Sequence, residues 1–243
     1  MDHIVIKGIP LSLMTTNKIS SRGRGDLDIL VDSNDLMYAI DVLKELGFYT
    51  CHDFMPDNLS TNWGHFCRWM FYEILLVKCH PEGMQYIDLH WRISNLRSNF
   101  DSTKTLIKRS ITVYINDYPI NTLSHRDALL LSAAHSAKDK WTSIRDSIDI
   151  SRLSKYVFSE SIQPLYKNSS FRMSLAVAFE NTGSTSTYLE TSKLDLFVKY
   201  ALTVSNKSQD LNYKSHYLFE YNFFDLLIFV FHDILMTRNI QDI

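Results

Sequence analysis

The sequence predicts an α+β fold, in which a small mixed sheet with helices is followed by a mostly helical C-terminal part. Up to about residue 123, short β-branched runs alternate with stretches of helical spacing, whereas from Ser124 onward the apolar residues recur at the helical period. The 243 residues are 45% hydrophobic, enough for a large core, and include only 7 Gly and 5 Pro, too few for a disordered chain. We therefore expect an α/β core over residues 1–123 and a helical domain over residues 124–243.

The first predicted elements are a strand at Ile4–Ile6, a turn at Lys7-Gly8 and a helix through Pro10–Met14. A glycine-containing turn between a strand and a helix offers backbone N–H groups to an anion, and Lys7 adds a positive charge. Lys7 and Gly8 are therefore candidate residues for binding the phosphates of a nucleotide.

The next predicted strand, Asp26–Val31, begins with two acidic residues. Because successive residues of a strand point to opposite faces, Asp26 and Asp28 should project together. Leu27 and Ile29 should then turn into the core. Two adjacent carboxylates repel each other unless a cation lies between them, and Mg²⁺ (or Mn²⁺) takes such oxygen ligands. Asp26 and Asp28 are therefore candidate metal ligands, with an Asp-x-Asp pair in a surface turn as the plain alternative.

A basic turn, Arg22-Gly23-Arg24-Gly25, directly precedes this acidic strand. Arginine suits bidentate contact with phosphate oxygens, and the glycines make the turn flexible. The turn and the acidic strand together predict a metal site that handles a nucleoside triphosphate (NTP), with Arg22 and Arg24 binding its phosphates.

Between residues 35 and 115 the pattern predicts a helix, a hairpin and a further strand. Asp35–Leu46 has the apolar spacing of a helix, with Gly47 as its C-cap. Cys67–Tyr72 and Ile74–Val77 predict the two strands of a hairpin, and Ser110–Ile115 predicts another strand.

The strand predicted at Met84–Trp91 carries a third acidic residue. Asp88 and His90 share one face of this strand, and Ile87 and Leu89 share the other. A third carboxylate can therefore meet the first two across the sheet. His90 contacts a phosphate, orients a carboxylate or is a structural histidine, and the sequence leaves these readings open.

The C-terminal part is predicted to be helical. Ser124 fits an N-cap, with Asp127 three residues on. Further helices are expected at Ser143–Tyr156, Phe171–Phe179, Leu194–Leu202 and Tyr221–Leu235. The apolar run Phe223–Phe231 is too short to span a bilayer, so no membrane association is expected.

The net charge of −2 lacks the basic excess of a protein that grips long nucleic acid, so a nucleotide and a small acceptor are expected instead. The three cysteines are too far apart for CxxC zinc chemistry and are expected to be reduced thiols. The chain starts directly with a strand and shows no signal-peptide pattern. We therefore expect a cytoplasmic protein.

Taken in order, these motifs resemble one known family. They are Lys7-Gly8, Arg22 four residues ahead of Asp26, the run Asp26–Val31 and Asp88-Leu89-His90-Trp91, followed by Ala134–Trp141 with Arg145, Asp146 and Asp149. The combination, over residues 4–155, is similar to the uncharacterised nucleotidyltransferase-like family of the DNA polymerase β superfamily. The resemblance implies a polymerase β-like nucleotidyltransferase palm in which Asp26, Asp28 and Asp88 are catalytic and hold two divalent ions.

The resemblance also implies roles for single residues. Asp88 would bridge the ions or act as base toward an acceptor hydroxyl. His135 and Lys138, one helical turn apart, would bind nucleotide phosphates, and a capped or solvent-facing pair is the alternative. Trp91 and Trp141 would stack on a base or lie in the core, and the large apolar area of an indole favours the core.

The implied reaction moves an NMP unit from an NTP to a hydroxyl group of an unidentified small-molecule, peptide or protein acceptor. Two metal ions neutralise the charge on the attacking and leaving oxygens. Two alternatives stay open. The first is a catalytically inactive nucleotide-binding regulatory or interaction protein, which the turn favours because it reads Lys7-Gly8 where most members carry Gly-Ser. The second is a two-metal phosphohydrolase that uses the same carboxylates on water.

Overall fold

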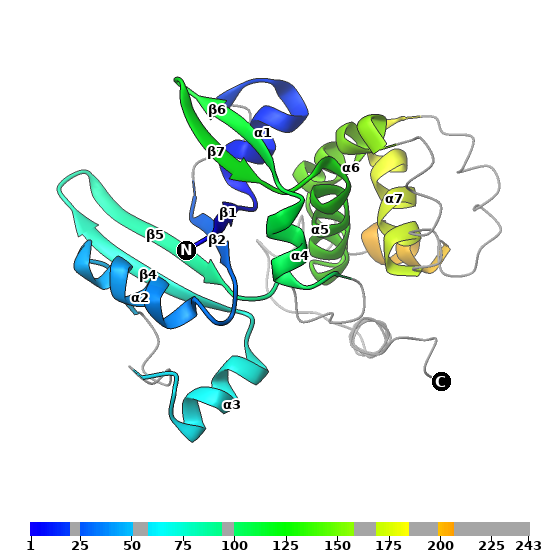
Figure 1. The fold of residues 1–243 in the computed structure, drawn as a ribbon. Helices are drawn as coiled ribbons and strands as arrows, with labels where there is room; N and C mark the ends of the chain where they lie inside the picture. Colours follow the sequence, from blue (N-terminus) through cyan, green and yellow to red (C-terminus); the bar gives the residue numbers. More distant parts are fainter. Residues whose placement is uncertain (20–24, 51–57, 94–99, 158–168, 185–198, 207–243) are drawn as a thin grey trace. The chain divides into compact units, whose positions relative to one another are not determined.

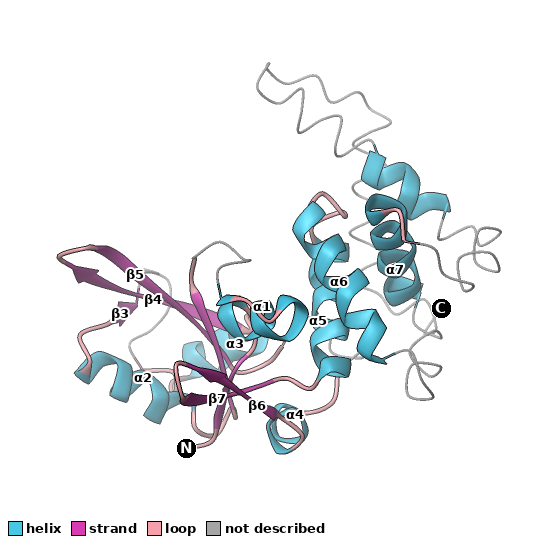
Figure 2. Cartoon of the chain, turned by 90° about the horizontal axis from the view of Figure 1, so that it is seen from above, coloured by secondary structure: helices cyan, strands magenta, loops and turns pink. Residues whose placement is uncertain are grey.

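The computed structural model describes residues 1–19, 25–50, 58–93, 100–157, 169–184 and 199–206. By its internal contacts the chain divides into two compact units, Met1–Ala128 and Leu129–Ile243. Among the described residues, strands occur only in the first unit, and the second unit is helical (Figure 2). The α+β class predicted from the sequence is therefore confirmed.

The first unit is built on a mixed sheet whose described strands have the order β3-β4-β5-β2-β1-β7-β6 (Figure 1). The strands are β1 (His3–Val5), β2 (Leu27–Val31), β3 (Tyr49–Thr50), β4 (Glu73–His80), β5 (Gly83–His90), β6 (Ile111–Ile115) and β7 (Tyr118–Thr122). β2 pairs with β1 antiparallel and with β5 parallel, and β7 pairs with β1 parallel. The pairs β3–β4, β4–β5 and β6–β7 are antiparallel. The two strands that carry the predicted acidic residues, β2 and β5, are thus neighbours in the middle of the sheet.

Most of the described helices were predicted from the sequence. Those of the first unit are α1 (Gly8–Thr16), α2 (Leu36–Glu45), α3 (Asn62–Met70) and α4 (Thr103–Lys108), with α3 and α4 as the exceptions that were not predicted. The later helices are α5 (His125–Lys138), which begins in the first unit, α6 (Ile144–Val157) and α7 (Ser169–Thr182). Residues 199–206 are also helical, so the helix expected at Leu194–Leu202 is described only in part. The helix expected at Tyr221–Leu235 and the apolar run Phe223–Phe231 lie outside the described residues.

One face of the sheet forms the main core of the first unit. Its buried members on α2 and on strands β2, β4 and β5 are Leu36, Ala39, Ile40, Leu43, Val31, Ile74, Leu76, Ile87 and Leu89. Because side chains alternate along a strand, the opposite face of β2 and β5 carries Asp28, Asp88 and His90. The core therefore fixes which face presents the acidic residues.

The expectation for Leu27 is wrong. This side chain shares the face of Ile29, but it is 43% exposed. Leu27 is the first residue of β2, and only Ile29 and Val31, further along the strand, pack with the core. The strand thus begins outside the core, and the acidic residues lie at this open end.

The hairpin expected from Cys67–Tyr72 with Ile74–Val77 is also wrong. Cys67 lies in α3, and the hairpin is formed by β4 and β5 instead. The Oγ1 atom of Thr61 caps α3 by accepting a hydrogen bond from the N–H of Gly64 at 3.0 Å. Cys67 is buried in the core, which leaves the aromatic residues of α3 on its outer side. This cap and the single buried face outweigh the strand-like composition of the segment.

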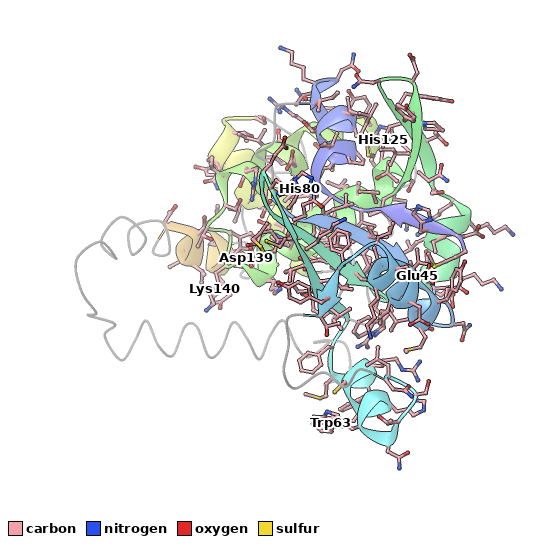
Figure 3. The ribbon with its side chains drawn as sticks, turned by 90° about the vertical axis from the view of Figure 1, so that its left-hand side faces the viewer. Glu45, Trp63, His80, His125, Asp139 and Lys140 are labelled. Carbon is pink, nitrogen blue, oxygen red and sulfur yellow. The ribbon has the colours of Figure 1, made fainter. Side chains whose placement is uncertain are left out.

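The outer side of α3 carries an aromatic cluster. The rings of Trp63 and Phe66 stack with centroids 5.2 Å apart, and Trp69 follows at 6.2 Å from Phe66. All three side chains are exposed by 45–59%, and Figure 3 labels Trp63 on this helix. The C-terminus of α3 is tied to the end of β5, because Trp91 Nε1 donates a hydrogen bond to the carbonyl of Arg68 at 3.0 Å.

The N-terminus of α5 is capped as expected. The Oγ atom of Ser124 accepts a hydrogen bond from the N–H of Asp127 at 3.2 Å and donates to the Asp127 carboxylate at 2.7 Å. Arg109 adds two further hydrogen bonds to this fully buried carboxylate, both 2.6 Å long. The buried charge of Asp127 is therefore fully paired.

Both tryptophans of the resemblance lie in the core, because Trp91 is 2% and Trp141 0% exposed. Their indole nitrogens donate to protein acceptors, the carbonyl of Arg68 and the hydroxyl of Ser174. Neither indole is available to stack on a base. Cys67 and Cys79 are free thiols. None of the described helices is both long and apolar enough to cross a bilayer.

Candidate active site

The parallel pairing of β2 with β5 brings two of the predicted acidic residues together. The register places Asp28 directly beside Asp88 and Leu30 beside His90. Oxygen and nitrogen atoms of Asp28, Asp88 and His90 all lie within 4.8 Å of one another, close enough for a shared ion. The third acidic residue, Asp26, is exposed just before β2, and its carboxylate is close enough to Asp88 to raise the pKa of that residue. The register therefore brings Asp28 and Asp88 together, and Asp26 interacts with Asp88 from the start of the strand.

Asp28 is the most buried of the three, at 5% exposure. Its Oδ1 atom lies 3.2 Å from Lys7 Nζ and 3.1 Å from His90 Nε2. Burial alone raises the pKa of Asp28, but the hydrogen bond with His90 and the charge of Lys7 outweigh it and leave the pKa below its usual value. Asp28 is therefore an ionised carboxylate whose charge is already balanced by its neighbours.

Asp88 behaves in the opposite way. Burial raises the pKa of Asp88, and the hydrogen bond that it shares with Asp26 and the surrounding carboxylates raise it further, to about 7. A carboxyl group with a pKa of about 7 is partly protonated at neutral pH, so Asp88 keeps a proton that an isolated aspartate would lose. A divalent cation can replace this proton, because it supplies the positive charge that the proton provides.

The donor set fits a hard divalent cation such as Mg²⁺ or Mn²⁺. Asp26, Asp28 and Asp88 offer carboxylate oxygens, the ligand type that these ions prefer. Burial and the neighbouring carboxylates both raise the pKa of Asp88, and a cation at this position would relieve both effects. The ring of His90 is turned to Asp28 through Nε2, so the structure favours the reading in which this histidine orients a carboxylate.

Sequence reasoning missed Glu73, the first residue of β4. It lies opposite His90 in the β4–β5 register, and its Oε2 atom is 3.2 Å from His90 Nδ1. Its negative charge also contributes to the raised pKa of Asp88. The only sequence signal for Glu73 is its place across the hairpin from His90, and that place was hidden because the hairpin was assigned to the wrong segment.

The Lys7-Gly8 turn lies where β1 passes into α1. Lys7 precedes the helix in extended conformation, and Gly8 has φ +61°, a value that favours glycine. A Cβ at Gly8 would meet no described atom within 4 Å. The turn therefore leaves open space beside the first residue of α1, while the Lys7 ammonium lies on Asp28.

The other predicted nucleotide-binding residues are not brought to this site by the described structure. Arg22 and Arg24 lie outside the described residues. His135 and Lys138 belong to the second unit, where His135 Nδ1 is 3.0 Å from Asp146 and 3.4 Å from Asp139. Lys138 is exposed near the end of α5.

Comparison with known proteins gives a family match and one similar solved structure. The sequence profile of a family described as "Uncharacterised nucleotidyltransferase" matches residues 1–177. No curated protein matches the chain. The crystal structure of an antigenic nucleotidyltransferase-like protein from Paracoccidioides brasiliensis aligns with 78% of this chain and 84% of its own, at 16% sequence identity and a TM-score of 0.45.

Proposed function

Because this chain belongs to the uncharacterised nucleotidyltransferase family, we propose that it moves an NMP unit from an NTP to a hydroxyl group of an acceptor. The observation that carries the proposal is the register that places Asp28 beside Asp88, with Asp26 interacting with Asp88 at the start of the same strand. A small molecule, peptide or protein is the proposed acceptor, because the chain lacks the net positive charge that long nucleic acid requires. A cytoplasmic location is part of the same proposal.

In this reaction Asp26, Asp28 and Asp88 would hold Mg²⁺ or Mn²⁺. When bound, these ions would neutralise charge on the transferred phosphoryl group and on the leaving pyrophosphate. Asp88 is proposed to take the proton of the acceptor hydroxyl, the role that the family resemblance gives to the third carboxylate. The acceptor oxygen forms the new bond to the α-phosphorus as the bond to pyrophosphate breaks.

The same proposal assigns the nucleotide phosphates to basic groups near the acidic strands. Lys7 and Gly8 bind them at the start of α1, where the backbone N–H groups of a helix favour anions. Arg22 and Arg24 precede Asp26 in the sequence and are proposed as further phosphate ligands. His90 acts on Asp28 in this scheme.

His135 and Lys138 stay proposed as nucleotide-binding residues on the family resemblance alone. The contacts of His135 with Asp146 and Asp139 would have to be exchanged for phosphate. A His135→Gln variant that binds NTP as tightly as the wild-type chain would remove this part of the proposal.

The test incubates the purified chain with each of the four NTPs, labelled at the α-phosphate, together with Mg²⁺ or Mn²⁺ and a cell extract. Transfer of the label to a small molecule, peptide or protein is the expected result. Labelled NMP or NDP without an adduct would identify a phosphohydrolase, and bound NTP without turnover would identify an inactive nucleotide-binding protein.

Matched variants connect the activity to the site. Asp26→Asn and Asp88→Asn should each lower transfer at least about a hundredfold, since each removes a proposed metal ligand. Asp41→Asn makes the same chemical change at an exposed position of α2 and should leave transfer unchanged. Transfer by Asp88→Asn at the wild-type rate would overturn the proposal.

A further inference from the structure

Glu73 and Asp28 lie on opposite sides of one buried imidazole ring. The His90 side chain is 1% exposed, with Nδ1 at 3.2 Å from Glu73 Oε2 and Nε2 at 3.1 Å from Asp28 Oδ1. The three residues belong to three adjacent strands, β4, β5 and β2. They form a continuous line of polar groups from the half-exposed Glu73 to the acidic site.

The contact on the Asp28 side has a defined direction. A carboxylate oxygen accepts hydrogen bonds, so His90 donates from Nε2 to Asp28. A ring that also donates from Nδ1 to Glu73 carries a proton on both nitrogens. Lys7 Nζ contacts the same oxygen, Oδ1, at 3.2 Å. Among the described residues, the Oδ2 atom of Asp28 has no donor. The two basic groups therefore occupy one oxygen and leave the other available as a ligand.

The contact on the Glu73 side is close but not aligned. His90 Nδ1 is buried and makes no well-aligned hydrogen bond with a described residue, although the Glu73 carboxylate lies 3.2 Å away. A buried nitrogen without such a bond is costly. Glu73 is 35% exposed at its side chain, and its carboxylate faces this nitrogen as a hydrogen-bond acceptor.

The pairing of β4 with β5 fixes the position of the His90 ring, and the two ring nitrogens face Asp28 and Glu73. Glu73 and His90 are a directly opposed pair in the β4–β5 register. The ring of Tyr72 lies 5.8 Å from the ring of His90, centroid to centroid. A carboxylate that holds the far nitrogen of a histidine sets the orientation of the near one, as is common around metal sites.

We infer that Glu73 is a positioning residue, which accepts a hydrogen bond from Nδ1 of His90 and thereby holds Nε2 on Oδ1 of Asp28. Oδ2 of Asp28 is then kept free for the divalent cation. The inference rests on the proposed function for its consequence, the cation, whereas the contacts of His90 with Asp28 and Glu73 do not depend on any reaction.

The first test measures Mn²⁺ binding by electron paramagnetic resonance. Glu73→Ala should weaken Mn²⁺ binding about tenfold or more, the usual effect of losing a partner behind a metal ligand. Glu73→Gln keeps an acceptor oxygen and should retain most of the affinity. Glu82→Ala removes an exposed carboxylate from the turn of the same hairpin and should bind Mn²⁺ like the wild-type chain.

The second test needs no metal and no substrate. In ¹⁵N-labelled protein, the Nε2–H signal of His90 should be protected from exchange with water in the wild-type chain and in Glu73→Gln, and lost in Glu73→Ala. An unchanged signal in Glu73→Ala would overturn the inference, and so would a Gln variant as impaired as the Ala variant. If the wild-type chain bound no Mn²⁺, the proposed function would fail while this signal would still decide the role of Glu73.

Discussion

At the scale of single residues, the three acidic side chains of the site are not equivalent. Asp28 is buried and paired with Lys7 and His90, whereas Asp26 is exposed and interacts with the partly buried Asp88. We therefore expect loss of charge at Asp28 to affect the fold, and loss of charge at Asp26 or Asp88 to affect mainly the proposed binding of a cation.

This difference predicts that substitutions of Asp28 and of Asp26 change the free energy of unfolding by different amounts. Asp28→Asn should lower the free energy of unfolding by about 1–3 kcal/mol, because it weakens the acceptor of two buried or half-buried donors. Asp26→Asn should leave it nearly unchanged, because Asp26 is exposed. Urea titration of both variants without divalent ions measures the two values. Equal losses in the two variants would contradict the assigned pairing.

The raised pKa of Asp88 predicts a pH dependence of stability in the absence of metal. The folded chain binds this proton more tightly than the unfolded chain, so its stabilising effect is complete below about pH 4 and is lost as the pH rises toward 7. Asp88→Asn cannot lose a proton. The melting temperature of the variant, relative to wild type, should rise from pH 5 to pH 8 when both are measured by circular dichroism with a chelator. A constant difference across this range would refute the assignment.

The same scale shows what sequence could and could not predict about the site. The alternation of Asp26 with Asp28, and of Asp88 with His90, follows from the period of a strand and could be read directly. Glu73 could not, because its role depends on which residue it faces across a hairpin. Nor does the sequence indicate that His90 binds Asp28 and not a phosphate, since a histidine on a strand fits either.

At the scale of elements, prediction succeeded where one periodicity dominated a segment. α2 and α6 have a clear apolar stripe, and β2 and β5 have short apolar runs beside charged residues. The sequence therefore predicts these two helices and these two strands. α3 was not predicted, because its aromatic and polar residues fit a strand as well as a helix. Its conformation is decided by the Thr61 cap and by close packing at Gly64.

That packing predicts the effect of adding one methyl group to α3. A Cβ at Gly64 would lie 2.5 Å from the carbonyl carbon of Leu59, which is backbone and cannot rotate away. Gly64→Ala should therefore cost about 1–3 kcal/mol of stability. Gly25→Ala is the matched control, since a Cβ there meets no described atom within 4 Å. Thermal unfolding of the two variants would contradict this account if Gly64→Ala melted like wild type.

At the scale of the whole molecule, the two units are expected to respond differently to a cation. The proposed ligands all lie within Met1–Ala128. Mn²⁺ at about a hundred times its dissociation constant should stabilise this unit by about 2.7 kcal/mol. Calorimetry should show the rise in one transition, reversed by a chelator and absent in Asp88→Asn. Asp41→Asn should retain the shift, and a shift of equal size in Asp88→Asn would argue against the site.

The pairing of β2 with β5 joins groups that are far apart in the chain, since His90 and Asp28 are separated by 62 positions. If one of these strands shifted its register by one residue, its acidic side chain would point toward the apolar core face of the sheet. During synthesis on the ribosome, the polypeptide must extend past β5 before Asp28 and Asp88 can lie side by side. A chain that ends before Asp88 should therefore lack the proposed cation site, and Mn²⁺ binding would report that the two strands have paired in the correct register.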